Sequence, residues 1–180
     1  MSASVSSTPI SVEEYLRNPE YEHAEYVDGR IAPLNVGTKD HGRIQARLSQ
    51  ALWNHIDRSG GGYVATELHC RLTIEGVTRF RLPDLSVVLA DEDPQQRYLN
   101  RAPDLAVEIR SPEDSVTELL RKAEEYFANG SKLVWIILPE EESVLVRTAD
   151  GRVRPVTRDE TLEGGDALPG LSLVVADLFR

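Results

Sequence analysis

The sequence predicts an α/β fold in which a central mixed β-sheet is flanked by helices. Along the chain, a helix, a hairpin and a second helix precede several strands, a third helix and further strands, which is the order expected of an α/β sandwich. Residues 104–110, 115–129 and 132–138 read as strand, helix and strand, and this succession fits a right-handed βαβ unit. The helices expected at 39–58 and 115–129 should both lie against the sheet.

The N-terminal part of the chain is expected to form a short helix, a hairpin and a long helix. A capping-box pattern at 11–14 predicts a helix that ends near 18–19. Residues 22–33 resemble a hairpin around an Asp-Gly turn at 28–29. A long helix is expected over 39–58, because apolar residues recur there every four positions, at Ile44, Leu48, Leu52 and Ile56.

The rest of the chain is dominated by strand patterns. A second capping box, at 115–118, begins a helix with an apolar stripe, and Asn129-Gly130 ends it. The remaining expectations are strands at 63–74 and 77–90 around a turn at 75–76, a polar loop at 91–103, strands at 104–110 and 132–138, two weaker strands around 150–151, and a short strand with a terminal turn at 168–179.

Bulk properties bound the class of protein. With 180 residues, the chain is expected to form a single domain over 9–180, after a short, polar, disordered start at 1–8. The single cysteine, Cys70, excludes an internal disulfide framework and is typical of a reducing cytosol, so a cytoplasmic location is expected. No run has the length of a membrane span. The net charge of −10 argues against non-specific coating of nucleic acid, but not against a nuclease whose site is built from carboxylates.

Two carboxylates interrupt runs that otherwise read as buried strands. Asp84 follows Pro83 in one run, and Glu108 lies in the other, two residues before Arg110. Because side chains alternate along a strand, Glu108 and Arg110 are expected on one face and Ile109 on the opposite face. A buried carboxylate is costly unless it is paired or binds a metal, so the two acids form a functional-site hypothesis.

Five short segments, taken in their order along the chain, resemble a known family. The segments are Tyr26 to Gly29, Leu82 to Leu85, Pro103 to Pro112, Lys122 to Tyr126 and Leu168 to Leu171. Together they are similar to the Uma-two family of restriction-endonuclease-like proteins, which belongs to the PD-(D/E)XK nuclease superfamily. The resemblance extends from about residue 10 to residue 179.

The resemblance implies a restriction-endonuclease-like fold and metal-dependent hydrolysis of phosphodiester bonds, with DNA as the expected substrate and Mg²⁺ or Mn²⁺ as the cofactor. By position, Asp84 and Glu108 match the acidic residues of the two motifs. Arg110 stands where the superfamily pattern has lysine, and Lys122, on the following helix, is the candidate for that role. Two further positions, Glu25 and His41, resemble an additional N-terminal acid and a histidine of the family and are weaker metal-ligand candidates.

Each of these residues can be given a chemical role. Mg²⁺ prefers oxygen ligands, which Asp84, Glu108 and the backbone carbonyl of Ile109 could supply. Arg110 can act only electrostatically, on a phosphate or on Glu108, because a guanidinium stays protonated. Lys122 could orient the attacking water or, with a depressed pKa, accept its proton.

Simpler structural readings of the same residues exist. Asp84 could start a strand or cap a turn, Glu108 and Arg110 could form a structural ion pair, and His41 could occupy a buried polar pocket. Glu25 could be an exposed hairpin residue, and Lys122 a solvated helix lysine, since Arg121, Glu124 and Glu125 indicate that much of its helix is wet.

The main alternative function is a catalytically inactive interaction module that keeps the nuclease fold. Arg110 in place of lysine, the acidic net charge and the lack of a recognisable DNA-reading element favour it. Binding of Mn²⁺ or Mg²⁺ through the two carboxylates would separate the two readings. A third reading, hydrolysis of RNA or a nucleotide, would be tested by comparing cleavage of labelled RNA and DNA. Cleaving both strands of a duplex needs two cuts, which the two subunits of a homodimer could supply.

Overall fold

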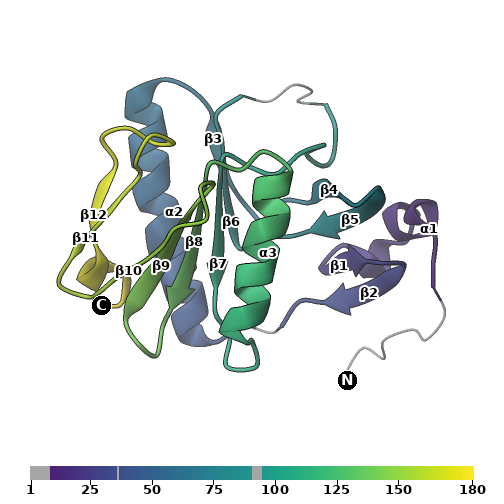
Figure 1. Cartoon of the computed structure of the whole chain (residues 1–180), viewed down its shortest axis with the longest axis horizontal. Coiled ribbons are helices and arrows are strands. Elements are labelled where there is room, and N and C mark those ends of the chain that lie inside the picture. The colour runs from purple at the N-terminus through teal and green to yellow at the C-terminus, as the bar shows by residue number, and fades with distance from the viewer. Residues whose placement is uncertain (1–8, 36, 91–94) are drawn as a thin grey trace.

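In the computed structural model, two helices cover opposite faces of a six-stranded sheet, and a smaller four-stranded sheet lies to one side (Figure 1). The structure describes residues 9–35, 37–90 and 95–180. The start expected to be disordered, 1–8, and residues 91–94 of the expected polar loop lie outside these residues. Within the described ranges, no helix is long and apolar enough to cross a bilayer.

The helices and strands follow one another as expected for most of the chain. Their bounds are α1 Val12–Arg17, η1 Pro19–Tyr21, β1 Ala24–Val27, β2 Arg30–Pro33, α2 Lys39–Ser59, β3 Tyr63–Thr66, β4 Cys70–Ile74, β5 Val77–Arg81, β6 Leu85–Val88, β7 Leu105–Ile109, α3 Val116–Ala128, β8 Leu133–Leu138, β9 Ser143–Thr148, β10 Val153–Val156, β11 Thr161–Glu163, β12 Ser172–Val174 and η2 Val175–Leu178. The strand β11, which pairs with β12, is an element that the sequence reading missed.

The six-stranded sheet is mixed, as predicted. Its strand order is β10-β9-β8-β7-β6-β3, with β7 and β8 parallel and every other pair antiparallel. The helix α3 connects the two parallel strands, so the predicted βαβ unit is confirmed. The four-stranded sheet, of order β2-β1-β5-β4, contains the predicted hairpin with its turn at Asp28 and Gly29, both at positive φ.

The two long helices form where their apolar stripes and caps place them. Thr38 caps α2 by accepting a hydrogen bond from the His41 amide, and Gly60, at φ +79°, ends the helix. The apolar stripe of α2 is buried against one sheet face, which includes Trp135. Ser115 caps α3, whose stripe packs on the opposite face and on β4.

The strand runs predicted at 63–74 and 77–90 were too long, because each is broken and shared between the two sheets. The first breaks at 67–69, where Glu67 has φ +48°, a value strained for a strand. The second breaks at 82–84, where Pro83 has no N–H to donate to a ladder. Asp84 therefore lies just before β6, not inside a strand.

A buried aspartate holds the start of β7. The Asp104 carboxylate, in a residue that is 5% exposed, accepts from the Leu89 amide at 3.0 Å, Arg101 at 3.1 Å and Lys132 at 2.9 Å. Burial alone would raise the pKa of Asp104, but these donors together hold it below its usual value. The carboxylate therefore stabilises the fold at pH values above its unfolded pKa of about 4, and this contribution is lost as the pH falls through the lower folded value.

The substitution Asp104→Asn is expected to lower the free energy of unfolding by about 2 kcal/mol at pH 7, because hydrogen bonds to a charged group contribute about 1.5–3 kcal/mol. The difference from wild type should shrink at pH 3. Urea unfolding at both pH values measures it, with the exposed Asp166→Asn as a control. An equal difference at pH 3 and pH 7 would show that the charge is not what stabilises the strand.

Candidate active site

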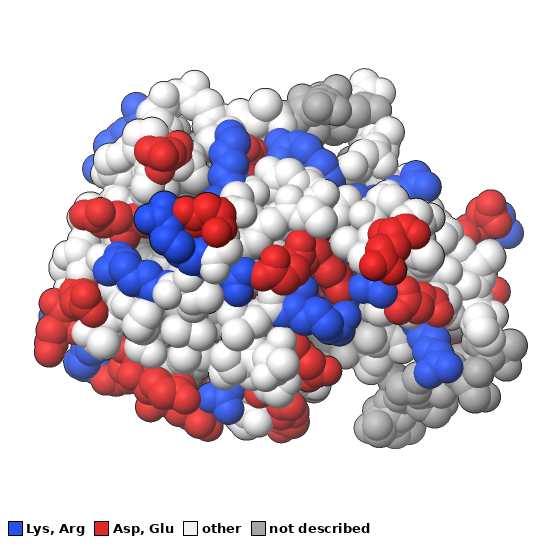
Figure 2. All heavy atoms as spheres, viewed as in Figure 1, with Lys and Arg blue, Asp and Glu red and all other residues white. Residues whose placement is uncertain are grey.

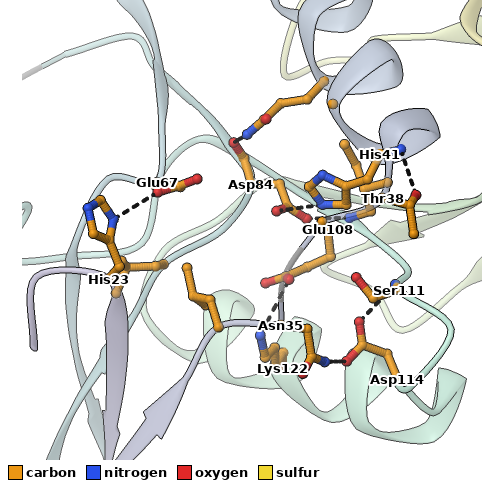
Figure 3. A pocket seen from close by; sticks show the side chains of 16 residues that line it. His23, Asn35, Thr38, His41, Glu67, Asp84, Glu108, Ser111, Asp114 and Lys122 are labelled. Carbon is orange, nitrogen blue, oxygen red and sulfur yellow. Dashed lines mark hydrogen bonds and ion pairs between the residues drawn. The ribbon is translucent and has the colours of Figure 1, made fainter. Parts of the chain in front are cut away.

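The topology of the sheet brings Asp84 and Glu108 together. Because β6 and β7 are antiparallel, with Leu85 opposite Val107, the residue that precedes β6 lies beside the end of β7. The Ile109 amide donates to the Asp84 carboxylate at 2.6 Å, which fixes this contact. Figure 3 shows the two carboxylates directed into the same pocket.

The pocket is a cavity of about 500 Å³ between the start of α2, the end of β7 and one face of α3. Its walls include Asp84, Glu108, Ile109, His41 and Lys122. Four of the predicted site side chains and the residue of the predicted carbonyl ligand therefore line one cavity, although they are spread over more than 80 positions of the sequence.

The Asp84 carboxylate is oriented from two sides. In addition to the Ile109 amide, His41 on α2 approaches the other carboxylate oxygen, with 3.0 Å between Nε2 and Oδ1. Gln45, one turn further along α2, donates to the Asp84 backbone carbonyl at 2.9 Å. The hydrogen bond to Asp84 raises the pKa of His41, although burial opposes this. His41 thus contacts a site carboxylate directly, and this contact occupies the Nε2 atom of the ring.

Glu108 lies almost wholly buried on the face of β7 that packs on α3. It is 5% exposed and accepts from the Tyr126 hydroxyl at 2.5 Å and from Lys122 at 3.4 Å. The pKa of Glu108 is raised to about 7, chiefly by burial; the nearby Lys122 opposes this rise, and the neighbouring Asp84 carboxylate adds to it. A cation in the pocket would therefore stabilise the charged form of Glu108.

Lys122 lies between two buried carboxylates. Its ammonium group is 3.4 Å from Glu108 and 3.0 Å from Glu25. Burial alone would lower the pKa of Lys122, but the two carboxylates raise it above its usual value. The option of a depressed pKa is therefore wrong for this arrangement, and the protonated lysine can act by orientation and charge.

The helix face around Lys122 is more buried than the sequence indicated. Glu125 was expected on a wet face, but it is 5% exposed and accepts hydrogen bonds from Arg81, Arg79 and Arg121. Burial of Glu125 follows from the packing of α3 over the second sheet, which a single helix pattern does not reveal.

Glu25 is buried on β1 and is not an exposed hairpin residue. One oxygen contacts Lys122 at 3.0 Å and the Leu82 amide at 3.3 Å, and the other accepts from Arg81 at 2.6 Å. These donors place Glu25 behind Lys122, whereas Asp84 and Glu108 form the wall of the pocket itself.

Arg110 is directed away from Glu108. The strand β7 ends at Ile109, so the predicted alternation does not extend to Arg110. Its guanidinium contacts Glu141 at 3.0 Å and the Asp114 carbonyl at 3.2 Å, and it lines a separate, smaller cavity. The expected pairing of Arg110 with Glu108 is therefore wrong.

Several residues in or behind the pocket were not predicted from the sequence as site residues: Gln45, Glu67, Arg81, Asp114, Glu125 and Tyr126. Tyr126 had a signal, because it follows Lys122 by four residues and so lies on the same helix face. Arg81 had a weaker signal, since it stands directly between the apolar residues Phe80 and Leu82, and a charged group buried there needs a partner.

The donor set fits a hard divalent cation. Within a strand the N–H and C=O of one residue point to the same side, so the Ile109 carbonyl lies on the side of Asp84, to which its amide donates. Asp84, Glu108 and this carbonyl are all oxygen donors, and Mg²⁺ usually keeps several waters as its remaining ligands. Among the described residues, no three His, Cys, Asp or Glu side chains form a group that could hold an ion by themselves.

Comparison with known proteins places this architecture in a family. A crystal structure described as a "putative nuclease belonging to DUF820", from Anabaena variabilis, is similar with a TM-score of 0.82 and 25% identity, over 95% of this chain and 98% of that chain. The restriction-endonuclease-like fold is thereby confirmed. An uncharacterized protein from Synechocystis sp. is 34% identical over 105 residues, which are 57% of this chain and 54% of that protein, so the match spans about half of the relative. The family model of Uma2, described as "Putative restriction endonuclease", matches residues 12–176, and the chain belongs to this family.

Proposed function

We propose that the protein is a metal-dependent endonuclease that hydrolyses phosphodiester bonds in DNA. The observation that carries the proposal is the convergence of two carboxylates, from the ends of neighbouring antiparallel strands, with a protonated lysine in one cavity. The family description and the printed name of the similar crystal structure support a nuclease.

The residues divide the chemistry among them. Asp84, Glu108 and the Ile109 carbonyl would hold Mg²⁺ or Mn²⁺, which supplies charge stabilisation and a water of lowered pKa. His41 and the Ile109 amide fix the Asp84 carboxylate, and Tyr126 fixes that of Glu108. Lys122, held protonated, can orient a water or stabilise negative charge on the phosphate as it develops.

Surface charge does not point to broad DNA binding. The chain carries a net charge of −10, and Figure 2 shows acidic and basic side chains interspersed over the face that bears α3. A divalent cation at the pocket would offset the repulsion between this surface and a phosphate backbone. That two copies pair to cut a duplex, and that the protein is cytoplasmic, stay predictions.

One observation favours the alternative of an inactive interaction module. Arg110 faces Glu140 and Glu141 rather than the pocket, so the position that carries lysine in the superfamily contributes no charge to the site. We favour the nuclease, because Lys122 supplies a cation within 3.4 Å of Glu108 from a different element.

Cleavage of labelled nucleic acids tests the proposal. The purified protein is incubated with single-stranded DNA, duplex DNA or RNA, in Mg²⁺, Mn²⁺ or EDTA. The expected result is internal cleavage of DNA that EDTA abolishes. Cleavage of RNA but not of DNA would identify RNA as the substrate and leave the proposed metal-dependent mechanism unchanged. Cleavage that persists in EDTA would contradict that mechanism.

The substitution Tyr126→Phe is expected to weaken Mn²⁺ binding about tenfold or more, because groups that orient a metal ligand typically contribute that much. Tyr126 is fully buried and donates to Glu108 at 2.5 Å, so the variant removes one donor without opening a large cavity. Calorimetric titration measures the change. Tyr26→Phe is the matched control, because it removes a hydroxyl that donates to the Ile10 carbonyl, away from the pocket. Equal Mn²⁺ affinities of the Tyr126→Phe and Tyr26→Phe variants would show that the Tyr126 hydroxyl does not contribute to metal binding.

A further inference from the structure

Behind the pocket lies a chain of buried charges that the proposed chemistry does not use directly. Arg81, on β5, is 3% exposed, and its two carboxylate partners, Glu25 and Glu125, are 4% and 5% exposed. These residues come from β5, β1 and α3, so the contact joins the smaller sheet to the helix that bears Lys122.

The guanidinium of Arg81 uses separate nitrogens for its two partners. Nε and Nη2 bind the Glu125 carboxylate at 2.7 and 2.9 Å, in the paired geometry that an arginine fork provides. The remaining nitrogen, Nη1, binds Glu25 at 2.6 Å. A lysine could not make this set of contacts, because its ammonium is a single point of charge.

Glu25 connects Arg81 to Lys122, because it contacts both cations. Arg81 binds one oxygen of Glu25, and the Lys122 ammonium contacts the other oxygen at 3.0 Å. The same ammonium is 3.4 Å from Glu108. Without Arg81, only the Leu82 amide, at 3.3 Å, and Lys122 itself would hold the Glu25 carboxylate, which could then turn and draw Lys122 away from Glu108.

We propose that Arg81 is a positioning residue that, through Glu25, holds the Lys122 ammonium against Glu108. Stability alone does not require such a network, since replacing buried ion pairs by apolar residues is often neutral or stabilising. The inference rests on the proposed function only for the role of Lys122 in catalysis, because the position of the ammonium can be measured without any substrate.

Arg79 provides a matched control. It also binds Glu125, at 2.6 Å, but its second partner is Asp28 at the hairpin turn and not Glu25. Arg79→Met and Arg81→Met therefore both remove a cation from Glu125, and only Arg81→Met removes one from Glu25.

The composition of the chain makes the test direct. There are only three lysines, Lys39, Lys122 and Lys132, so protein labelled with ¹³C-lysine gives three ε-methylene signals in an NMR spectrum. The Lys122 side chain is 18% exposed and that of Lys132 is 58% exposed, which separates their environments. The signal that disappears in Lys122→Arg is assigned to Lys122.

The expected result is that Arg81→Met moves the Lys122 signal by more than its line width, while Arg79→Met leaves it in place. If Arg81→Met does not fold, Arg81→Gln is measured with the same expectation, because a neutral amide removes the cation from Glu25 and adds no lysine signal. An unmoved Lys122 signal in the folded Arg81 variant, or equal shifts in the Arg79 and Arg81 variants, would overturn the proposal.

Kinetics then separate this proposal from the proposed function. In saturating metal, Arg81→Met should lower kcat about ten- to a hundredfold with KM little changed, since small misplacements of a reacting group have effects of that size. Arg79→Met should keep the wild-type kcat. A wild-type protein that cleaves nothing would refute the proposed nuclease, whereas the NMR shift would still decide whether Arg81 positions Lys122.

Discussion

The substitution Asp84→Asn is expected to abolish cleavage, with a loss of about a thousandfold or more. Asp84 is the more accessible of the two carboxylates, and both of its oxygens are already oriented by donors, at 2.6 Å from the Ile109 amide and 3.0 Å from His41. Asparagine keeps the shape but removes the negative charge and directs an amide at one of these donors. Several kcal/mol of metal-derived stabilisation would be lost, and each 1.4 kcal/mol is about tenfold in rate.

The rate is measured on labelled DNA at saturating Mg²⁺ and again at saturating Mn²⁺. The control is Asp57→Asn, which changes the same residue type at an exposed position near the far end of α2. Circular dichroism of both variants confirms that they are folded. If Asp84→Asn kept more than a tenth of the wild-type rate, Asp84 could not be an essential ligand.

The second large effect is expected for Lys122→Met, which should lower kcat about a hundred- to a thousandfold while metal binding persists. Removing one preorganised donor at a site of developing charge has effects of this size. Methionine keeps the length of the side chain without the ammonium that lies 3.4 Å from Glu108. Removing that cation makes the pocket more negative, so the affinity for Mn²⁺ should be equal to or higher than that of wild type.

Separate titration and kinetics distinguish this outcome from simple misfolding. Lys39→Met is the control, since it removes an exposed ammonium at the first residue of α2. A Lys122→Met variant that binds metal and cleaves at the wild-type rate would exclude the lysine from the chemistry. If the variant lost both metal binding and cleavage, Lys122 would instead be needed to maintain the structure of the pocket.

Periodicity and capping were sufficient to predict the helices α2 and α3 and the βαβ unit. These elements are decided by local patterns, such as the buried stripe of α2 and the capping serine of α3. The carboxylate pair was found for a different reason, because Asp84 and Glu108 stand in apolar surroundings where a charge needs a partner. The resemblance to the family supplied Lys122, Glu25 and His41 as candidates.

The parts that could not be predicted depend on tertiary packing. The breaks at 67–69 and 82–84 send one chain segment into two sheets, and only the assembled fold shows where each sheet ends. Arg110 departs from the strand alternation because β7 ends one residue earlier. Glu125 reads as an exposed helix residue until Arg81, 44 positions away, is brought against it.

Calorimetric titration of Mn²⁺ into the wild-type protein, Asp84→Asn and Glu108→Gln tests the central claim most directly, because it requires no knowledge of the substrate. The titration is repeated in the presence of a DNA duplex, so that a site completed by phosphate oxygens is also detected. We expect binding to the wild type that each substitution abolishes. Absence of binding to the folded wild type, with and without DNA, would contradict the metal site and favour the interaction module.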